Sequence, residues 1–181
     1  MFNLNSLKIN NNRFLNNSIG IEIFKRLGAL ETLDLTANGI GLLNSDCFSD
    51  LKKLENLILD YNNLKVVSWE PFNSLNSLSE LSMRNSSIEE IIVSDKRNST
   101  SLKKLDMSFN LLTKISKLTF YDHYLLEELD LKHNLINQFE LESFDNLKNL
   151  TYLNIDRQMN GQMKQLGFYR SECLNEETTQ V

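Results

Sequence analysis

The chain has 181 residues, of which 33 are leucine and 24 are asparagine, and its net charge is −5. This length allows one domain with a sizeable core or an elongated array of similar mass. No uninterrupted apolar run approaches the ~20 residues of a membrane-spanning helix. The acidic balance disfavours a nucleic-acid partner, because phosphate binding needs a basic surface. Two cysteines are too few for a small disulfide-rich scaffold.

An eleven-residue frame, LxxLxLxxNxL, recurs along the chain and is complete in residues 30–40. Within each copy the leucines alternate with polar residues, which is the pattern of a strand with one buried face. A return segment must follow each strand, so we expect the strands to stack in parallel and to cover one another. They are expected near the start of each copy, at Leu4, Leu30, Leu54, Leu78, Leu102, Leu126 and Leu150.

An asparagine column keeps the same register at the end of each expected strand. An inward-facing amide carries both donors and an acceptor, and it can therefore satisfy backbone groups where the chain turns. Ser86 and Gln158 occupy this place in two of the copies. The asparagines expected to form this structural ladder are Asn12, Asn38, Asn62, Asn110 and Asn134.

A phenylalanine column precedes most copies by six residues and predicts a second buried row behind the strands. Lys96 interrupts this row, so residues 93–101 are expected to form a looser loop. His123 replaces a second-row leucine and is expected to be partly buried with a backbone partner. The column consists of Phe24, Phe48, Phe72, Phe120, Phe144 and Phe168.

Over residues 1–170 this pattern resembles the leucine-rich repeat family. The period of 24 residues and the phenylalanine column resemble its typical subfamily, as in the extracellular arrays of Toll-like receptors and small leucine-rich proteoglycans. The resemblance implies an α/β-type solenoid, a right-handed superhelix with a parallel sheet on its concave face and loops and short 3-10 segments on its convex face. We expect the repeat domain to cover residues 1–168 and a polar, disordered tail to cover 169–181.

The sequence contains none of the common catalytic motifs, and we expect no enzymatic activity, cofactor or metal. Asp106 and Asp130 should be neighbours on adjacent strands, where a solvated pair is a simpler interpretation than a cation site. Cys47 lies just before Phe48 and is expected to be a buried, inert thiol.

The outward side chains of the strands form the best candidate binding site. Seven strands at ~4.8 Å spacing make a face ~30 Å across, which suits a protein ligand. Apolar, aromatic and arginine residues on this face are expected to be its anchors. We expect neither a nucleic acid nor a small-molecule substrate as partner. The candidate protein-binding residues are Ile58, Tyr61, Arg84, Phe109, His133, Tyr152 and Arg157.

The repeats are compatible with more than one cellular compartment. The copies begin and end without polar capping units, so we expect a fragment of a longer cell-surface or secreted receptor, with the full-length form membrane-anchored. The alternatives are an intracellular scaffold, which would be cytoplasmic, and an extracellular-matrix structural protein. Candidate N-glycosylation sequons occur about as often as the composition predicts by chance, at Asn16, Asn85, Asn98 and Asn149.

Overall fold

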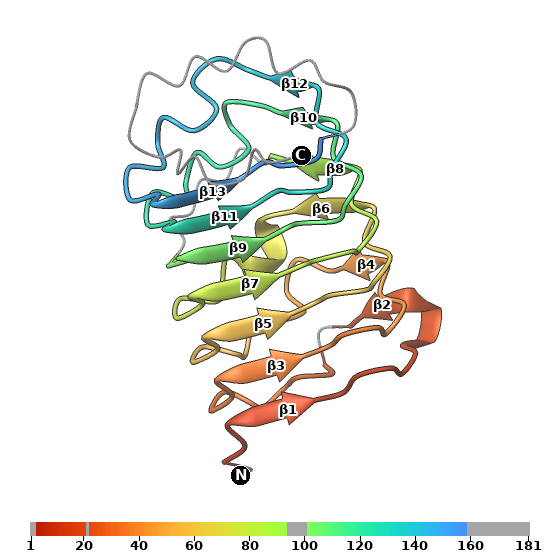
Figure 1. Ribbon diagram of the computed structural model, residues 1–181. Coiled ribbons are helices and arrows are strands. Elements are labelled where there is room, and N and C mark those ends of the chain that lie inside the picture. Colours follow the sequence, from red (N-terminus) through yellow and green to blue (C-terminus); the bar gives the residue numbers. More distant parts are fainter. Residues whose placement is uncertain (1–2, 21, 94–100, 159–181) are drawn as a thin grey trace, which may run out of the picture.

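The computed structural model describes residues 3–20, 22–93 and 101–158. Within these ranges the chain winds into a solenoid whose turns each contribute one strand to a seven-stranded parallel sheet (Figure 1). The strands follow one another in sequence order across the sheet, as β1 (Ser6–Lys8), β3 (Thr32–Asp34), β5 (Asn56–Ile58), β7 (Glu80–Ser82), β9 (Lys104–Asp106), β11 (Glu128–Asp130) and β13 (Tyr152–Asn154). This is the leucine-rich repeat architecture that the 24-residue period predicts, and the fold prediction is confirmed.

A second set of strands, of two or three residues each, forms along the flank of the solenoid, where the chain leaves the main sheet (Figure 1). In the described part of the chain they pair in parallel as β2 (Ser18–Ile19) with β4 (Leu42–Leu43), β6 (Val66–Ser68) with β8 (Glu90–Ile92), and β10 (Lys114–Ile115) with β12 (Gln138–Phe139). The 3-10 helices are η1 (Leu15–Asn17) and η2 (Glu70–Phe72). Pro71 lies at the start of η2, where its fixed φ and missing N–H are tolerated.

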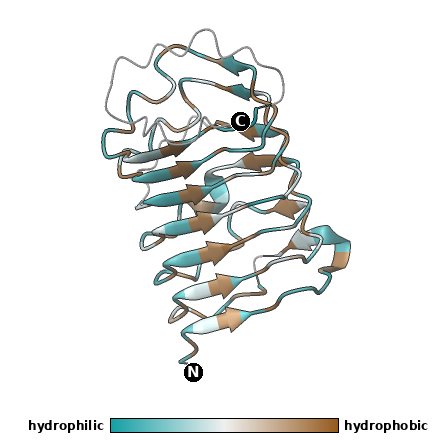
Figure 2. Ribbon diagram, in the orientation of Figure 1, coloured by the Kyte–Doolittle hydropathy of each residue, from teal (hydrophilic) through white to brown (hydrophobic). Residues whose placement is uncertain are grey.

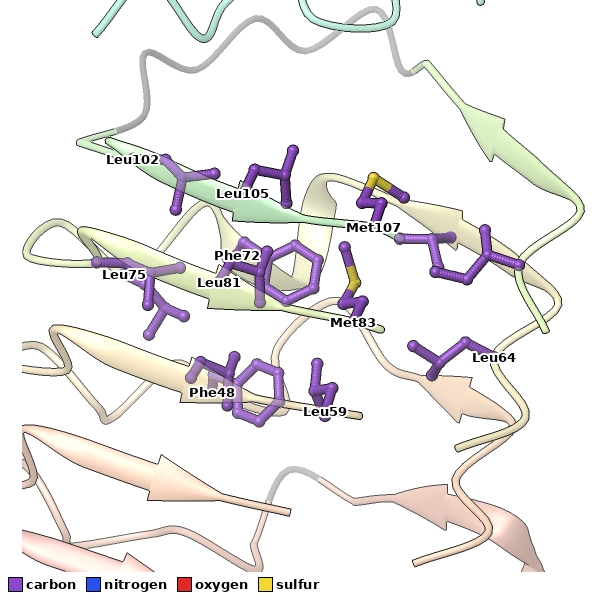
Figure 3. Close-up of a cluster of buried hydrophobic side chains, with 14 of the residues drawn as sticks. Phe48, Leu59, Leu64, Phe72, Leu75, Leu81, Met83, Leu102, Leu105 and Met107 are labelled. Atoms are coloured by element: carbon purple, nitrogen blue, oxygen red, sulfur yellow. The ribbon is translucent and has the colours of Figure 1, made fainter. Parts of the chain in front are cut away.

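The central leucine of each strand pairs with the central leucine of the next, as Leu57 does with Leu81 and Leu81 with Leu105. Hydrophobic colour therefore recurs at the same place on successive strands (Figure 2). These side chains are buried against those of the return segments, where Phe48, Phe72 and Leu75 pack (Figure 3). No single turn covers its own apolar face, and the core is consequently continuous along the solenoid.

The phenylalanine row is present behind the sheet, but it is completed by a residue outside the expected column. Phe24, Phe48 and Phe72 stack with centroid separations of 5.9 and 6.2 Å. Trp69 then bridges from Phe72 to Phe120, at 6.2 and 6.3 Å, and its Nε1 donates to the Thr119 carbonyl at 2.9 Å. Lys96, most of the 93–101 loop, Phe168 and the tail lie outside the described residues.

His123 packs against Trp69 with a centroid distance of 4.3 Å and is almost fully buried. Neither ring nitrogen makes a hydrogen bond of ordinary geometry within the described structure, and the Phe120 backbone is the polar group that influences the ring. Burial lowers the pKa of His123 to about 4, against a weaker raising influence of the Phe120 backbone. At pH 7 the imidazole is therefore uncharged, and it packs in the core as an aromatic ring.

Candidate binding face

The Asn110 side chain shows how an asparagine of the ladder satisfies backbone groups where a strand ends. Its Oδ1 accepts from the backbone N–H groups of Ser86 (2.9 Å) and Ile88 (3.0 Å), and its Nδ2 donates to the carbonyls of Met83 and Met107 (both 2.9 Å). One buried side chain thus satisfies backbone groups in two consecutive repeats. Asn38, Asn62 and Asn134 make corresponding bonds, whereas Asn12 is exposed and donates to the Asn10 carbonyl.

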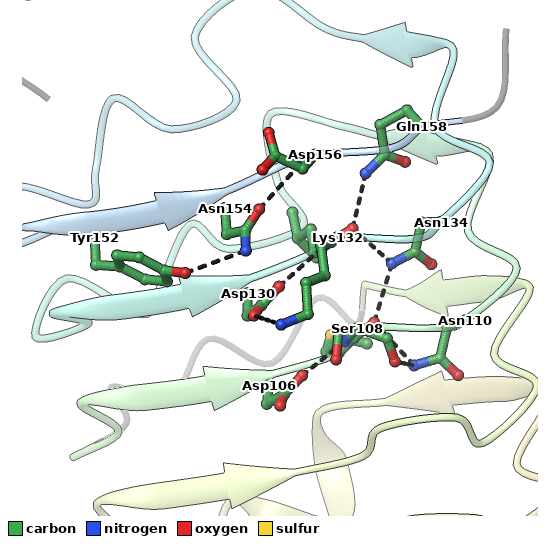
Figure 4. A network of polar contacts seen from close by, with 12 residues as sticks. Asp106, Ser108, Asn110, Asp130, Lys132, Asn134, Tyr152, Asn154, Asp156 and Gln158 are labelled. Carbon is green, nitrogen blue, oxygen red and sulfur yellow. Dashed lines mark hydrogen bonds and ion pairs between the residues drawn. The ribbon is translucent and has the colours of Figure 1, made fainter. Parts of the chain in front are cut away.

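The two departures from this column keep its function by different means. Ser86 Oγ donates to the Leu59 carbonyl at 2.8 Å. Gln158 is one methylene longer than asparagine, yet its Nε2 reaches the Leu131 carbonyl at 2.8 Å and its Oε1 accepts from Ile136 (Figure 4). The seventh copy is therefore tied to the sixth by two hydrogen bonds of its Gln158 side chain.

The residue before each asparagine position has a left-handed backbone, with φ between 50° and 58°. L-residues pay about 1–2 kcal/mol for this conformation, so the turn imposes it regardless of the side chain. The candidate anchors Tyr61, Phe109, His133 and Arg157 all occupy this column.

Outward aspartates close the turn that follows three of the strands, β3, β9 and β11. Asp34, Asp106 and Asp130 accept hydrogen bonds from the backbone N–H two residues ahead, at 3.0, 2.8 and 2.9 Å. Asp106 and Asp130 are drawn in Figure 4. Burial alone would raise the pKa of Asp34, but hydrogen bonds from Thr36 and Asn10 outweigh it and lower that pKa. These carboxylates are structural acceptors as well as surface charges.

Asp60 belongs to a different column and bridges two repeats. Its Oδ1 accepts from Ser82 Oγ at 2.6 Å and from the Arg84 N–H at 2.9 Å. Burial raises the pKa of Asp60, and these hydrogen bonds only partly oppose it. Among the described residues no group of three or more histidines, cysteines and carboxylates is arranged to hold a metal ion.

A groove of about 370 Å³ crosses the outward side of the sheet, which is the concave face. Ile58 lies half-buried in it, and Tyr152, which is 49% exposed, forms one end. Lys104 is paired with Glu128 at 2.9 Å, so the carboxylates outnumber the free cations in this groove. Its polar lining consists of Asn56, Asp60, Glu80, Ser82, Lys104, Asp106, Glu128 and Asp130.

Beside the groove, Arg84, Phe109 and His133 form what we call the stacked ridge. The Arg84 guanidinium carbon lies 4.6 Å from the Phe109 ring centroid. Phe109 and His133 stack at 4.2 Å with an interplanar angle of 14°. Lys132 joins the two features, since its Nζ is 3.2 Å from Asp130 Oδ2 and 6.0 Å from the Phe109 centroid. Cation–π and ring stacking therefore hold this ridge in one arrangement.

The structure divides the candidate anchors into two groups. Ile58 and Tyr152 belong to the groove, and Arg84, Phe109 and His133 belong to the stacked ridge. Tyr61 is 51% exposed on the concave face, and Arg157 is exposed at the last described repeat. Lys132, Glu80 and Asp60 were not singled out from the sequence, although their places in the repeat register could have indicated them.

The remaining sequence features are the cysteine, the sequons and the search for a membrane span. Cys47 is buried, and burial raises the pKa of its thiol to about 12, so the thiolate is negligible at neutral pH. Asn16, Asn85 and Asn149 are exposed, and Asn98 lies outside the described residues. In the described part of the chain no helix has the length and apolar character required to cross a membrane.

One solved structure similar to this chain is the crystal structure of TLR13 in complex with the RNA ssRNA13. The two chains are 28% identical, with a TM-score of 0.69 over 77% of this chain. This chain spans 20% of the length of that TLR13 chain. Comparison with curated proteins found no match.

The TLR13 complex corrects one expectation. Net charge led us to exclude nucleic acid as a partner, and this exclusion is wrong, because a similar repeat array is solved with single-stranded RNA. Net charge averages over the whole surface, whereas a ligand meets only one local patch.

A family model described as leucine rich repeat matches residues 2–64 and 100–158, which together cover more than half of the chain. The matched segments contain six of the seven strands of the sheet, all except β7, and the asparagines of the ladder column. The chain therefore belongs to the leucine-rich repeat family, whose solenoids are ligand-binding modules.

Proposed function

We propose that this chain is the ligand-binding part of a receptor-like protein, at the cell surface or secreted, and that its concave face takes a protein ligand. The observation that carries the proposal is the pairing of an acidic groove with the stacked ridge on one sheet face. Aromatic and arginine side chains are enriched among residues that dominate binding energy. The two features together provide both apolar contact and opposite charges.

The mechanism is recognition by a surface that is already ordered. Strand pairing and the asparagine ladder fix the backbone, so few groups lose freedom when a ligand binds. The groove favours cationic side chains and the ridge favours anionic or aromatic ones, which gives the ligand an orientation. No chemical step is needed.

A binding screen tests this proposal. The purified chain is presented to arrays of secreted proteins and cell-surface ectodomains, with single-stranded RNA oligonucleotides as a further arm. We expect a protein whose affinity falls at least tenfold for Ile58→Asp and stays unchanged for Lys53→Ala, an exposed residue of a return segment. Protein ligands that respond equally to both variants would contradict the proposal.

Single-stranded RNA is a second candidate ligand, supported by the similarity to TLR13. Phe109 and His133 offer ring faces, and Arg84, Lys132 and Arg157 offer cations, which is the combination that stacks bases and neutralises phosphates. RNA binding would weaken steeply with added salt and depend on Arg84 and Lys132. Protein binding centred on Ile58 would be much less sensitive to salt.

The compartment is part of the same proposal. We infer passage through the secretory pathway, with glycans accepted at Asn16 and Asn149, both of which are exposed. Expression in a secreting cell followed by mass spectrometry of the glycopeptides tests this inference. Retention of the full-length product in the cytoplasm would favour an intracellular scaffold, and binding to fibrous matrix proteins would favour a structural role.

A further inference from the structure

The flank of the solenoid opens between the fourth and fifth repeats. There β8 pairs with β6, and β10 pairs with β12, but within the described structure β8 and β10 do not pair with each other. The last backbone hydrogen bond joining the two repeats on this side runs from the Leu111 N–H to the Ile88 carbonyl, at 2.7 Å. Beyond this bond no backbone hydrogen bond joins the two repeats on this side among the described residues.

Alternate pairs of repeats show which bonds are missing here, and the bond from the Lys65 N–H to the Gly41 carbonyl is likewise not formed among the described residues. The Glu89 N–H donates to the Lys65 carbonyl, and the Asn137 N–H donates to the Thr113 carbonyl. The corresponding bond from the Thr113 N–H to the Glu89 carbonyl is not formed among the residues that the structure describes. The Glu89 carbonyl and the Thr113 N–H, on opposite sides of the opening, therefore do not bond to each other.

A second backbone hydrogen bond, from the Ser116 N–H to the Ile91 carbonyl, is also missing in the described part of the chain, because Ser116 uses its N–H elsewhere. In the next repeat the Glu140 N–H donates to the Ile115 carbonyl. Ser116 holds the place of Glu140, but its N–H donates to Thr119 Oγ1 at 3.0 Å, so the Ile91 carbonyl receives nothing from the fifth repeat. Unpaired strand edges of this kind are templates for a further strand.

A groove of about 760 Å³ occupies this opening, and its lining includes all three residues with missing partners. Ile91, Leu111 and Leu135 supply its apolar part. On one bank Glu89 and Glu90 are exposed, and neither carboxylate has an ion pair in the described structure. On the other bank Lys114 is neutralised by Glu140 at 2.6 Å. The lining that the described residues give this groove is consequently negative.

We propose that this flank groove receives an extended segment of a protein partner, inserted as a strand between β8 and β10. The segment accepts from the Thr113 N–H and donates to the Glu89 and Ile91 carbonyls. It runs parallel to both strands, because every flank pair in the described structure is parallel. A basic side chain faces Glu89 and Glu90, and an apolar one contacts Ile91 and Leu111. This site is independent of the concave face.

Amide hydrogen exchange on the free protein is the first test. The Thr113 amide is expected to exchange rapidly, whereas the Asn137 and Glu89 amides, which are paired in the neighbouring rungs, are expected to be protected. Protection of Thr113 in the free protein would show that the two repeats close on each other, and the proposal would be wrong.

The second test adds a probe peptide of alternating valine and threonine with a lysine at each end, capped at both termini. Binding is expected below about 1 mM and should slow exchange at Thr113. The same peptide methylated on alternate backbone nitrogens should bind at least tenfold more weakly, because it keeps its side chains and loses strand donors. Equal binding of the two peptides, or none at 1 mM, overturns the proposal.

Protein variants complete the design. Thr113→Pro removes the free N–H and should abolish peptide binding, whereas Thr113→Val keeps the N–H and should leave it unchanged. If Thr113→Pro fails to fold, the double variant Glu89→Lys and Glu90→Lys replaces it and should weaken binding at least tenfold by charge reversal. Ligands of the concave face should bind every folded variant normally, which separates this site from the proposed function.

Discussion

The backbone N–H of Leu64 donates to the backbone carbonyl of Ser86 at 2.9 Å. In the next repeat the corresponding N–H, that of Ile88, donates to the side-chain oxygen of Asn110. Serine is too short to reach this N–H, and the main chain supplies the acceptor instead. The ladder thus tolerates a short hydroxyl where its own backbone can compensate.

Asn110→Ala should therefore be among the most damaging single changes. It leaves two buried N–H groups and the Met83 carbonyl without their partner, at ~4 kcal/mol of unfolding free energy, whereas the Met107 carbonyl keeps its bond from Asn134 Nδ2. Asn110→Ser should recover a measurable part of this loss, as Ser86 does naturally. Urea unfolding measures both values. Asn63→Ala, at an exposed neighbour of the ladder, is the control and should change stability by less than ~0.5 kcal/mol.

The free energy of unfolding should fall in mild acid, because His123 is buried without a charge. Its pKa is about 4 in the folded protein and 6.5 without burial, so the unfolded chain binds the proton more readily. Stability should fall as pH drops from about 6.5 to about 4, by ~3 kcal/mol relative to a variant without the imidazole. Denaturation of wild type and His123→Leu across this range, followed by the fluorescence of the single tryptophan, Trp69, measures the difference. Parallel curves for the two proteins would show that His123 titrates normally.

Ala37→Gly should stabilise the protein. Ala37 has φ of 57°, a conformation that costs L-residues about 1–2 kcal/mol and glycine almost nothing. The greater freedom of glycine in the unfolded chain offsets part of this gain, leaving ~0.5 kcal/mol. Ala29→Gly is the matched control, because Ala29 is not among the positive-φ residues, and it should destabilise. Thermal and urea unfolding check the opposite signs.

The repeat register was sufficient to predict the sheet, because a leucine every 24 residues can be buried only if equivalent strands stack. Strand centres such as Leu57 and Leu105 fall in their expected places. Trp69 was not assigned to the second row, since it belongs to no repeated column. It bridges the interrupted row by entering from the previous repeat, a long-range fit that spacing cannot encode.

The sequence was sufficient to predict which repeat positions face outward at the candidate site. It was not sufficient to predict which of these side chains contact one another. Outward positions such as Ile58 and Phe109 follow from strand alternation and the position before the asparagine. The stacking of Phe109 on His133 and the link through Lys132 depend on rotamers, which the register does not determine. The nucleic-acid exclusion failed for a related reason, because total charge carries no information about local arrangement.

Binding at the concave face is tested most directly by the affinity of one captured protein ligand for two double variants. Tyr61→Ala with Tyr152→Ala removes two half-exposed rings from the face, and Lys53→Ala with Asn76→Ala changes exposed residues of the return segments. We expect the first pair to weaken binding about thirtyfold and the second to leave it unchanged. Equal affinity of wild type and the tyrosine variant, with binding lost in the return-segment variant, would place the ligand on the opposite side of the solenoid.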